Sequence, residues 1–159
     1  MRRVLAAIVI FVSLAACSVA PGPQVLHPQY RYVASYAPGP FAPGAALHVE
    51  WTPQLLRTDS AEPYEVRLCI AVFGPFESAS ALKESESRSS GTRPDCPPTG
   101  AVVSTGAQRT RSDTGKPLAA DLVLPRGSGF YDVRQIAVNG VEPTYSATSA
   151  GGVIEVRGP

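Results

Sequence analysis

The sequence has few of the side chains that build metal sites and catalytic centres. Among its 159 residues are only two histidines, His27 and His48, and three cysteines. Those residue types most often bind transition metals, and the carboxylates are scattered without the spacing of a calcium-binding loop. We find no glycine-rich phosphate loop placed between a strand and a helix. We therefore expect no metal ion and no cofactor.

An excess of charge of either sign is missing as well. Lysine and arginine number 14 against 13 for aspartate and glutamate, which gives a formal net charge of +1. Because basic and acidic residues are nearly equal in number, the composition predicts neither a nucleic-acid surface nor a polybasic membrane patch. The 16 prolines and 14 glycines argue against long helices.

The longest apolar run is too short for a permanent membrane span. It covers residues 4–16 and is interrupted only by Ser13, whereas a transmembrane helix needs about 20 residues. Arg2 and Arg3 precede the run, and small residues close it. A positive start, an apolar middle and a small-residue end are typical of a secretory signal peptide.

The end of this run resembles the lipobox of bacterial lipoprotein precursors, with the residues Leu14, Ala15, Ala16 and Cys17. The resemblance implies that residues 1–16 are a signal peptide and that the chain is cleaved after Ala16. It also implies that Cys17 carries a covalent lipid, which anchors the protein on the extracytoplasmic side of a bacterial membrane. In a two-membrane cell, Ser18 implies the outer membrane facing the periplasm. The alternative is an ordinary secretory signal cleaved near Cys17.

The part after the lipobox divides into a tether and one domain. Residues 17–29 are rich in proline and almost free of charge, which predicts a semi-extended tether. Residues 30–159 are enough for a single domain. Lipidation of Cys17 leaves Cys69 and Cys96 as an even pair in an exported chain, where disulfides persist. We predict a bond between these two; a pair of free thiols is the alternative.

In the domain, apolar and polar residues alternate in the way that is typical of β-strands. In residues 45–52, Leu47, Val49 and Trp51 alternate with polar residues, so that one face is apolar. About seven short segments of this kind, separated by glycine and proline turns, predict an all-β antiparallel sandwich. These segments are residues 30–36, 45–52, 64–73, 99–110, 118–124, 130–139 and 152–157.

The connections give further expectations. Pro53 is expected to end the second strand, and Gly74 with Pro75 the third. Residues 77–98 are expected to form a polar loop that begins with one or two helical turns. Cys69 should point away from the core, so Cys96 would pin this loop against the outer face of the strand.

Two patterns near the C-terminal strands are also informative. The apolar pattern changes phase between Val133 and Ile136, which predicts a bulge. The stretch just before resembles the corner between strands E and F of immunoglobulin-like domains, with Leu122, Leu124 and Pro125 before a glycine turn and Tyr131 after it. This resemblance implies an immunoglobulin-like sandwich in which the hydroxyl of Tyr131 bonds back to the turn. The intersheet disulfide of antibody domains is not expected, since Cys96 lies in a proline-rich loop.

No set of residues predicts catalysis. Ser80 and Lys83 have the spacing of the Ser-x-x-Lys motif of penicillin-binding enzymes, but the other motifs of those enzymes are missing. A Ser-His-Asp triad would need His48, which should lie on the solvated face of its strand beside Glu50. We expect surface polar groups at both places, and a protein that is not an enzyme.

Two sets of side chains are candidates for binding. The phenylalanines beside Gly-Pro turns would form an exposed apolar patch, unless they pack over the ends of the sandwich; they are Phe41, Phe73 and Phe76. Four basic residues would bind an anionic partner if they cluster at one end, and otherwise keep hairpin ends soluble; they are Arg109, Arg111, Lys116 and Arg126.

Together these features predict a non-catalytic, lipid-anchored envelope protein whose sandwich presents loops to a partner protein or supports the envelope. Sandwiches of this kind commonly serve in interactions, which is an argument from fold. The alternative is a lipoprotein that binds or senses a small ligand in a pocket beneath residues 77–98.

Overall fold

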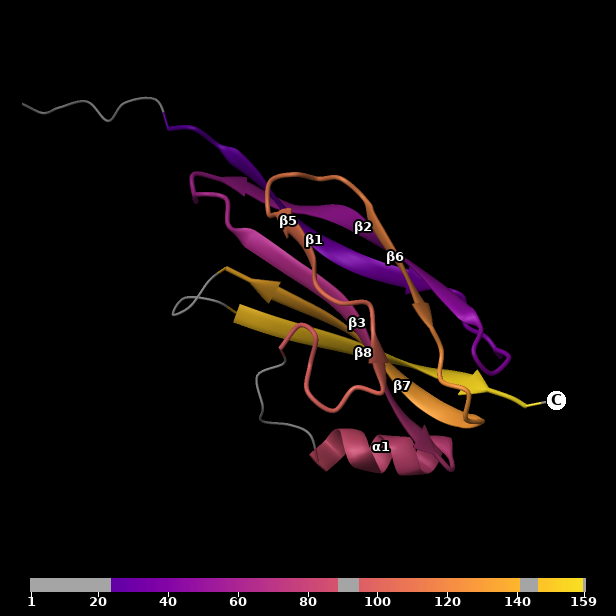
Figure 1. The fold of residues 1–159 in the computed structure, drawn as a ribbon. Helices are drawn as coiled ribbons and strands as arrows, with labels where there is room; N and C mark the ends of the chain where they lie inside the picture. Colours follow the sequence, from indigo (N-terminus) through magenta and orange to yellow (C-terminus); the bar gives the residue numbers. More distant parts are fainter. Residues whose placement is uncertain (1–23, 89–94, 141–145, 159) are drawn as a thin grey trace, which may run out of the picture.

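The computed structural model describes residues 24–88, 95–140 and 146–158. It contains two antiparallel sheets packed face to face (Figure 1). The first sheet has the order β1-β2-β6 and consists of β1 (His27–Tyr36), β2 (Ala46–Asp59) and β6 (Leu118–Val123). The second has the order β4-β3-β7-β8, with β5 also paired to β3; its strands are β3 (Glu65–Phe76), β4 (Val103–Ser104), β5 (Gln108–Arg111), β7 (Gly129–Asn139) and β8 (Ser146–Val156). The predicted all-β sandwich is confirmed.

The corner before β7 has the hydrogen bond that its sequence predicts. The hydroxyl of Tyr131 donates to the carbonyl of Gly127 at 2.8 Å, and the Tyr131 ring is buried. This hydrogen bond is the one that the resemblance to a tyrosine corner implies. In contrast to the constant-domain arrangement, β4 and β5 pair with β3 and do not extend the first sheet.

The core lies between the sheets and follows the period-two pattern. Leu47, Val49 and Trp51 of β2 are buried, and they meet a row of apolar residues on β3. That row is Val66, Leu68, Ile70 and Val72. Each such side chain contributes on the order of 2 kcal/mol by leaving water, so these two rows hold the sheets together.

A smaller apolar cluster lies on the outer face of the second sheet. It contains Cys69 and Ala71 of β3 together with Ile136 and Val138 of β7. Cys96 reaches this cluster and forms the disulfide with Cys69, with 5.8 Å between their Cα atoms. The predicted pairing, and the outward direction of Cys69, are confirmed.

The helix α1 (Ala79–Arg88) follows β3 and packs against β3 and β7 (Figure 1). Leu82 is fully buried in this contact. The helix is longer than the one or two turns expected at residues 77–83. The helix is largely polar in sequence, and Leu82 is its one large aliphatic side chain, so no apolar periodicity predicts it.

The phase change in β7 is not a bulge. The pairing of β7 with β8 runs without a shift from Gly129 to Asn139. Tyr131 and Val133 face the main core, whereas Ile136 and Val138 face the outer cluster. The pattern therefore changes because β7 is covered on opposite faces in its two halves.

The strand β2 does not end at Pro53 but continues to Asp59. Pro53 lies opposite Tyr32, whose carbonyl points to the free edge of β1, where it accepts a hydrogen bond from Gln135. The two residues are therefore a pair whose backbone groups point away from each other. On the other side β6 pairs with β2 only as far as Trp51. The nitrogen of Pro53 thus faces no strand, and its missing N–H removes no ladder bond.

Smaller differences concern four other boundaries. The last strand, β8, begins at Ser146 and not at residue 152 as expected. β1 begins at His27, inside the predicted tether. β3 passes Gly74 and Pro75 and reaches Phe76 after a register shift. The strand expected at residues 99–110 is two short strands, β4 and β5. The predicted signal peptide, the lipidation site Cys17 and the tether as far as residue 23 lie outside the described residues.

Candidate functional site

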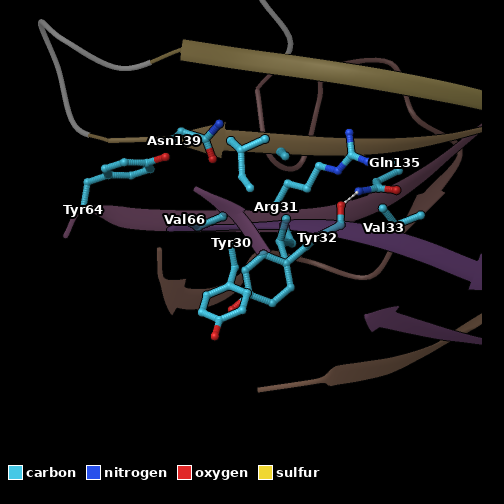
Figure 2. A pocket seen from close by; sticks show the side chains of 11 residues that line it. Tyr30, Arg31, Tyr32, Val33, Tyr64, Val66, Gln135 and Asn139 are labelled. Carbon is cyan, nitrogen blue, oxygen red and sulfur yellow. Dashed lines mark hydrogen bonds between the residues drawn. The ribbon is translucent and has the colours of Figure 1, made fainter. Parts of the chain in front are cut away.

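A groove of about 350 Å³ lies between the two sheets, beside the free edge of β1 (Figure 2). It is lined by Tyr30, Arg31, Tyr32, Val33, Leu56, Tyr64, Val66, Leu68, Gln135, Ala137 and Asn139. We call it the β1 groove. Its size is at the lower end of the range of ligand-binding pockets, about 300–1,000 Å³.

The edge of β1 itself forms one wall. Four consecutive residues, 30–33, line the groove, although neighbouring side chains of a strand point to opposite faces. The strand order explains this, because β1 is the outer strand of its sheet and β2 covers only one of its edges. The wall therefore includes backbone as well as side chains.

The side chain of Gln135 binds this edge from the other sheet. The N–H of Ala34 donates to its Oε1 at 2.7 Å, and its Nε2 donates to the carbonyl of Tyr32 at 2.6 Å. Figure 2 shows the amide of Gln135 directed at that carbonyl. One carboxamide thus takes a donor and an acceptor from β1, as a residue of a neighbouring strand would.

The floor and the open end differ in polarity. Val66 and Leu68 of β3 are buried at the floor, and Ala137 is half-buried beside them. Tyr64 and Asn139 both line the groove and are drawn at one end of it in Figure 2. Arg31 donates from Nε to Oε1 of Gln54 at 3.1 Å. The groove therefore suits an uncharged, largely apolar group that also carries hydrogen-bonding atoms.

The three phenylalanines predicted to bind are half-buried, and none lines the β1 groove. Phe41 packs against the main core, and its backbone N–H and carbonyl bond Glu155 and Arg157, each at 2.9 Å. The ring of Phe73 lies 4.9 Å from the guanidinium carbon of Arg134. Phe76 pairs with Phe130 across the second sheet. Each phenylalanine thus has packing of its own.

His48 lies on the exposed face of β2, as predicted, between two carboxylates. Its Nδ1 is 2.7 Å from Oδ1 of Asp121, and its Nε2 is 3.5 Å from Oε1 of Glu50. The hydrogen bond to Asp121 is the main reason that the pKa of His48 is raised from its ordinary value of 6.5. Since carboxylates contact both ring nitrogens, this arrangement offers no hydroxyl for His48 to activate. Sequence reasoning missed Asp121, which pairs with His48 across β2 and β6.

The basic residues do not form one cluster. Arg109 is 3.6 Å from Glu65, and Arg111 is 3.2 Å from Asp113, whose pKa is lowered chiefly by that hydrogen bond. Arg126 lies in the turn after β6, which is at the other end of the sandwich from β5 (Figure 1). Arg126 is therefore not part of a common patch with the arginines of β5, and a solubilising role at a hairpin end is left for it.

The remaining candidate sites offer little chemistry. Ser80 and Lys83 are exposed on α1. Within residues 24–88, 95–140 and 146–158, no three histidine, cysteine, aspartate or glutamate side chains are grouped so as to hold a metal ion. The described part of the chain contains no helix with the length and apolar character needed to cross a membrane.

Comparisons with protein-family models, with curated proteins and with solved structures find no match.

Proposed function

We propose that this protein is a lipid-anchored component of the bacterial cell envelope, and that its sandwich domain binds a partner protein without catalysing a reaction. The observation that carries the binding role is the β1 groove, which is apolar, bordered by backbone and lacks a nucleophile with a base beside it.

The anchor is supported by the lipobox residues that end at Cys17. Nine residues, 18–26, separate Cys17 from the start of β1 at His27. At about 3.1 Å per residue, a proline-rich segment of this length spans roughly 30 Å. The domain would therefore stay close to the membrane surface, where envelope partners are found.

A small-ligand-binding lipoprotein is the second candidate, and the volume of the β1 groove favours it. The groove differs from the pocket expected for that function, because none of its lining residues belongs to residues 77–98. A ligand that survives purification would be seen by native mass spectrometry as an added mass lost on denaturation.

Site-specific photocrosslinking in intact cells tests the binding role. A crosslinking amino acid at Val33, which is 40% exposed at the rim of the groove, should capture one reproducible protein. The same residue at Val123, exposed on the opposite edge strand of that sheet, is the matched control and should capture it much less. Equal labelling at both positions, or no reproducible protein at either, would contradict the proposal.

A further inference from the structure

We propose that the β1 groove binds an extended peptide segment, which adds to the free edge of β1 and places an apolar side chain between the sheets. The inference deepens the proposed function, since it names the chemistry of the partner at the same site. It rests on the hydrogen-bonding groups of the edge, on the contacts of Gln135 and on the shape of the floor.

The edge of β1 offers two backbone groups to a ligand. The N–H of Tyr30 donates to the carbonyl of Ser112 at 2.7 Å, and the carbonyl of Tyr32 accepts from Gln135. The N–H and carbonyl of one strand residue point to the same side, so the carbonyl of Tyr30 and the N–H of Tyr32 face the same edge. Among the described residues neither group has a hydrogen-bond partner. Both flank Arg31, in the stretch that lines the groove.

In a parallel pair of strands, each residue bonds the carbonyl before, and the N–H after, the residue opposite it on the other strand. The carbonyl of Tyr30 and the N–H of Tyr32 have this arrangement around Arg31. An added peptide residue would donate its N–H to Tyr30 and accept from Tyr32. Strand addition of this kind is a common mode of peptide recognition, in which the backbone supplies affinity and side-chain pockets supply specificity.

Gln135 shows that this edge accepts an amide. Its carboxamide already occupies the next donor and acceptor along β1, at Ala34 and Tyr32. The side chain therefore ends the available edge on one side, while the bond from Tyr30 to Ser112 ends it on the other. The open interval is short, which limits the backbone contact to about one peptide residue.

The floor of the groove suits an apolar side chain. A cavity of about 150 Å³ holds a benzene ring, so the 350 Å³ of the β1 groove holds one large side chain with room for part of a neighbour. Val66, Leu68 and Ala137 form the floor, and Leu56 adds an apolar rim. An aliphatic or aromatic residue is therefore expected beside the residue that pairs with β1.

The first experiment uses a display library of random short peptides selected on the purified mature protein in detergent. We expect binders that share one large apolar position. Ala137→Leu fills the floor and should weaken their binding at least about tenfold, while Ala119→Leu on the exposed face of β6 is the matched control and should leave it unchanged. Equal binding by both variants, or no selected peptide, would overturn the inference.

A second experiment tests the backbone pairing. Methylation of the peptide nitrogens one at a time should reduce affinity about tenfold at one position and much less at its neighbours. Gln135→Ala frees two more groups on β1 and should strengthen binding several-fold, which is opposite to the effect of Ala137→Leu. If no nitrogen is sensitive, or if Gln135→Ala weakens binding while thermal unfolding shows that it is folded, strand addition is wrong.

The two proposals can fail separately. Peptide binding in vitro without capture of a protein in cells would leave the groove chemistry standing and reject the proposed function. Capture of a partner in cells through Val123, with no effect of Ala137→Leu on it, would reject peptide addition at β1 and leave an interaction role standing at another surface.

Discussion

His48 is held between Asp121 and Glu50 on the exposed face of β2, and this gives the residue a measurable titration. The hydrogen bond to Asp121 is the largest contribution to its raised pKa, and Glu50 adds to it. Replacement Asp121→Asn should therefore lower the pKa of His48 toward its ordinary value of 6.5, and Glu50→Gln should lower it by less. An NMR titration of the imidazole protons, assigned with His48→Gln, measures both changes.

The raised pKa of His48 makes the stability of the folded protein depend on pH in a definite direction. Because the pKa is higher in the folded state, the contribution is fully present below the unfolded pKa of about 6.5 and is lost as the pH rises through the raised value. Wild type should thus exceed Asp121→Asn in stability at acid pH, and the difference should shrink in alkaline solution. A difference that grows with pH, or an unchanged pKa in Asp121→Asn, would show that the contact does not persist in solution.

The role of Gln135 is of a kind that could not be recognised in the sequence. A polar residue in β7 is unremarkable in the alternating pattern, and the nearby phase change predicts a bulge that is absent. Its partners, Tyr32 and Ala34, lie 103 and 101 positions away in the chain. No local pattern specifies such contacts, so the β1 groove could not be predicted from the sequence.

The disulfide joins the connection before β4 to the outer face of β3. It links positions 27 residues apart, and both cysteines are buried with Ala71, Ile136 and Val138. Closing a loop of this length restricts the unfolded chain and stabilises the fold by roughly 3–4 kcal/mol in the chain-entropy model.

The double variant Cys69→Ala, Cys96→Ala should therefore unfold at lower urea concentration, with a loss of about 3–4 kcal/mol. Urea unfolding of wild type with and without reductant gives the same comparison, and the double variant, which lacks the bond, should not respond to reductant. Alkylation of two free thiols in unreduced wild type would contradict the pairing.

The elements divide into those that a local pattern fixes and those that it does not. Strands with one buried face, such as the part of β2 that holds Leu47, Val49 and Trp51, follow from alternation alone. The tyrosine corner at Tyr131 was predictable because both partners lie within a few residues. The continuation of β2 past Pro53 depends on where β6 ends, and α1 depends on the burial of Leu82 against a distant sheet. Those two outcomes are set by tertiary structure.

In the proposed arrangement, a short tether connects the whole sandwich domain to a membrane. The sandwich is stabilised by the main core between the sheets, and by a second cluster closed by the Cys69–Cys96 disulfide. The β1 groove opens where β1 has no neighbouring strand. If the chain is attached through Cys17, residues 18–26 would hold the start of β1 within roughly 30 Å of the bilayer, which favours capture of a partner at that surface.

The proposed lipid on Cys17 is tested by the mass of the N-terminal peptide of the membrane-extracted protein. We expect a mature chain that begins at Cys17 and carries a diacylglyceryl group on sulfur, whereas Cys17→Ser should carry no lipid. A wild-type chain that begins at another residue, or an unmodified Cys17, would contradict the account.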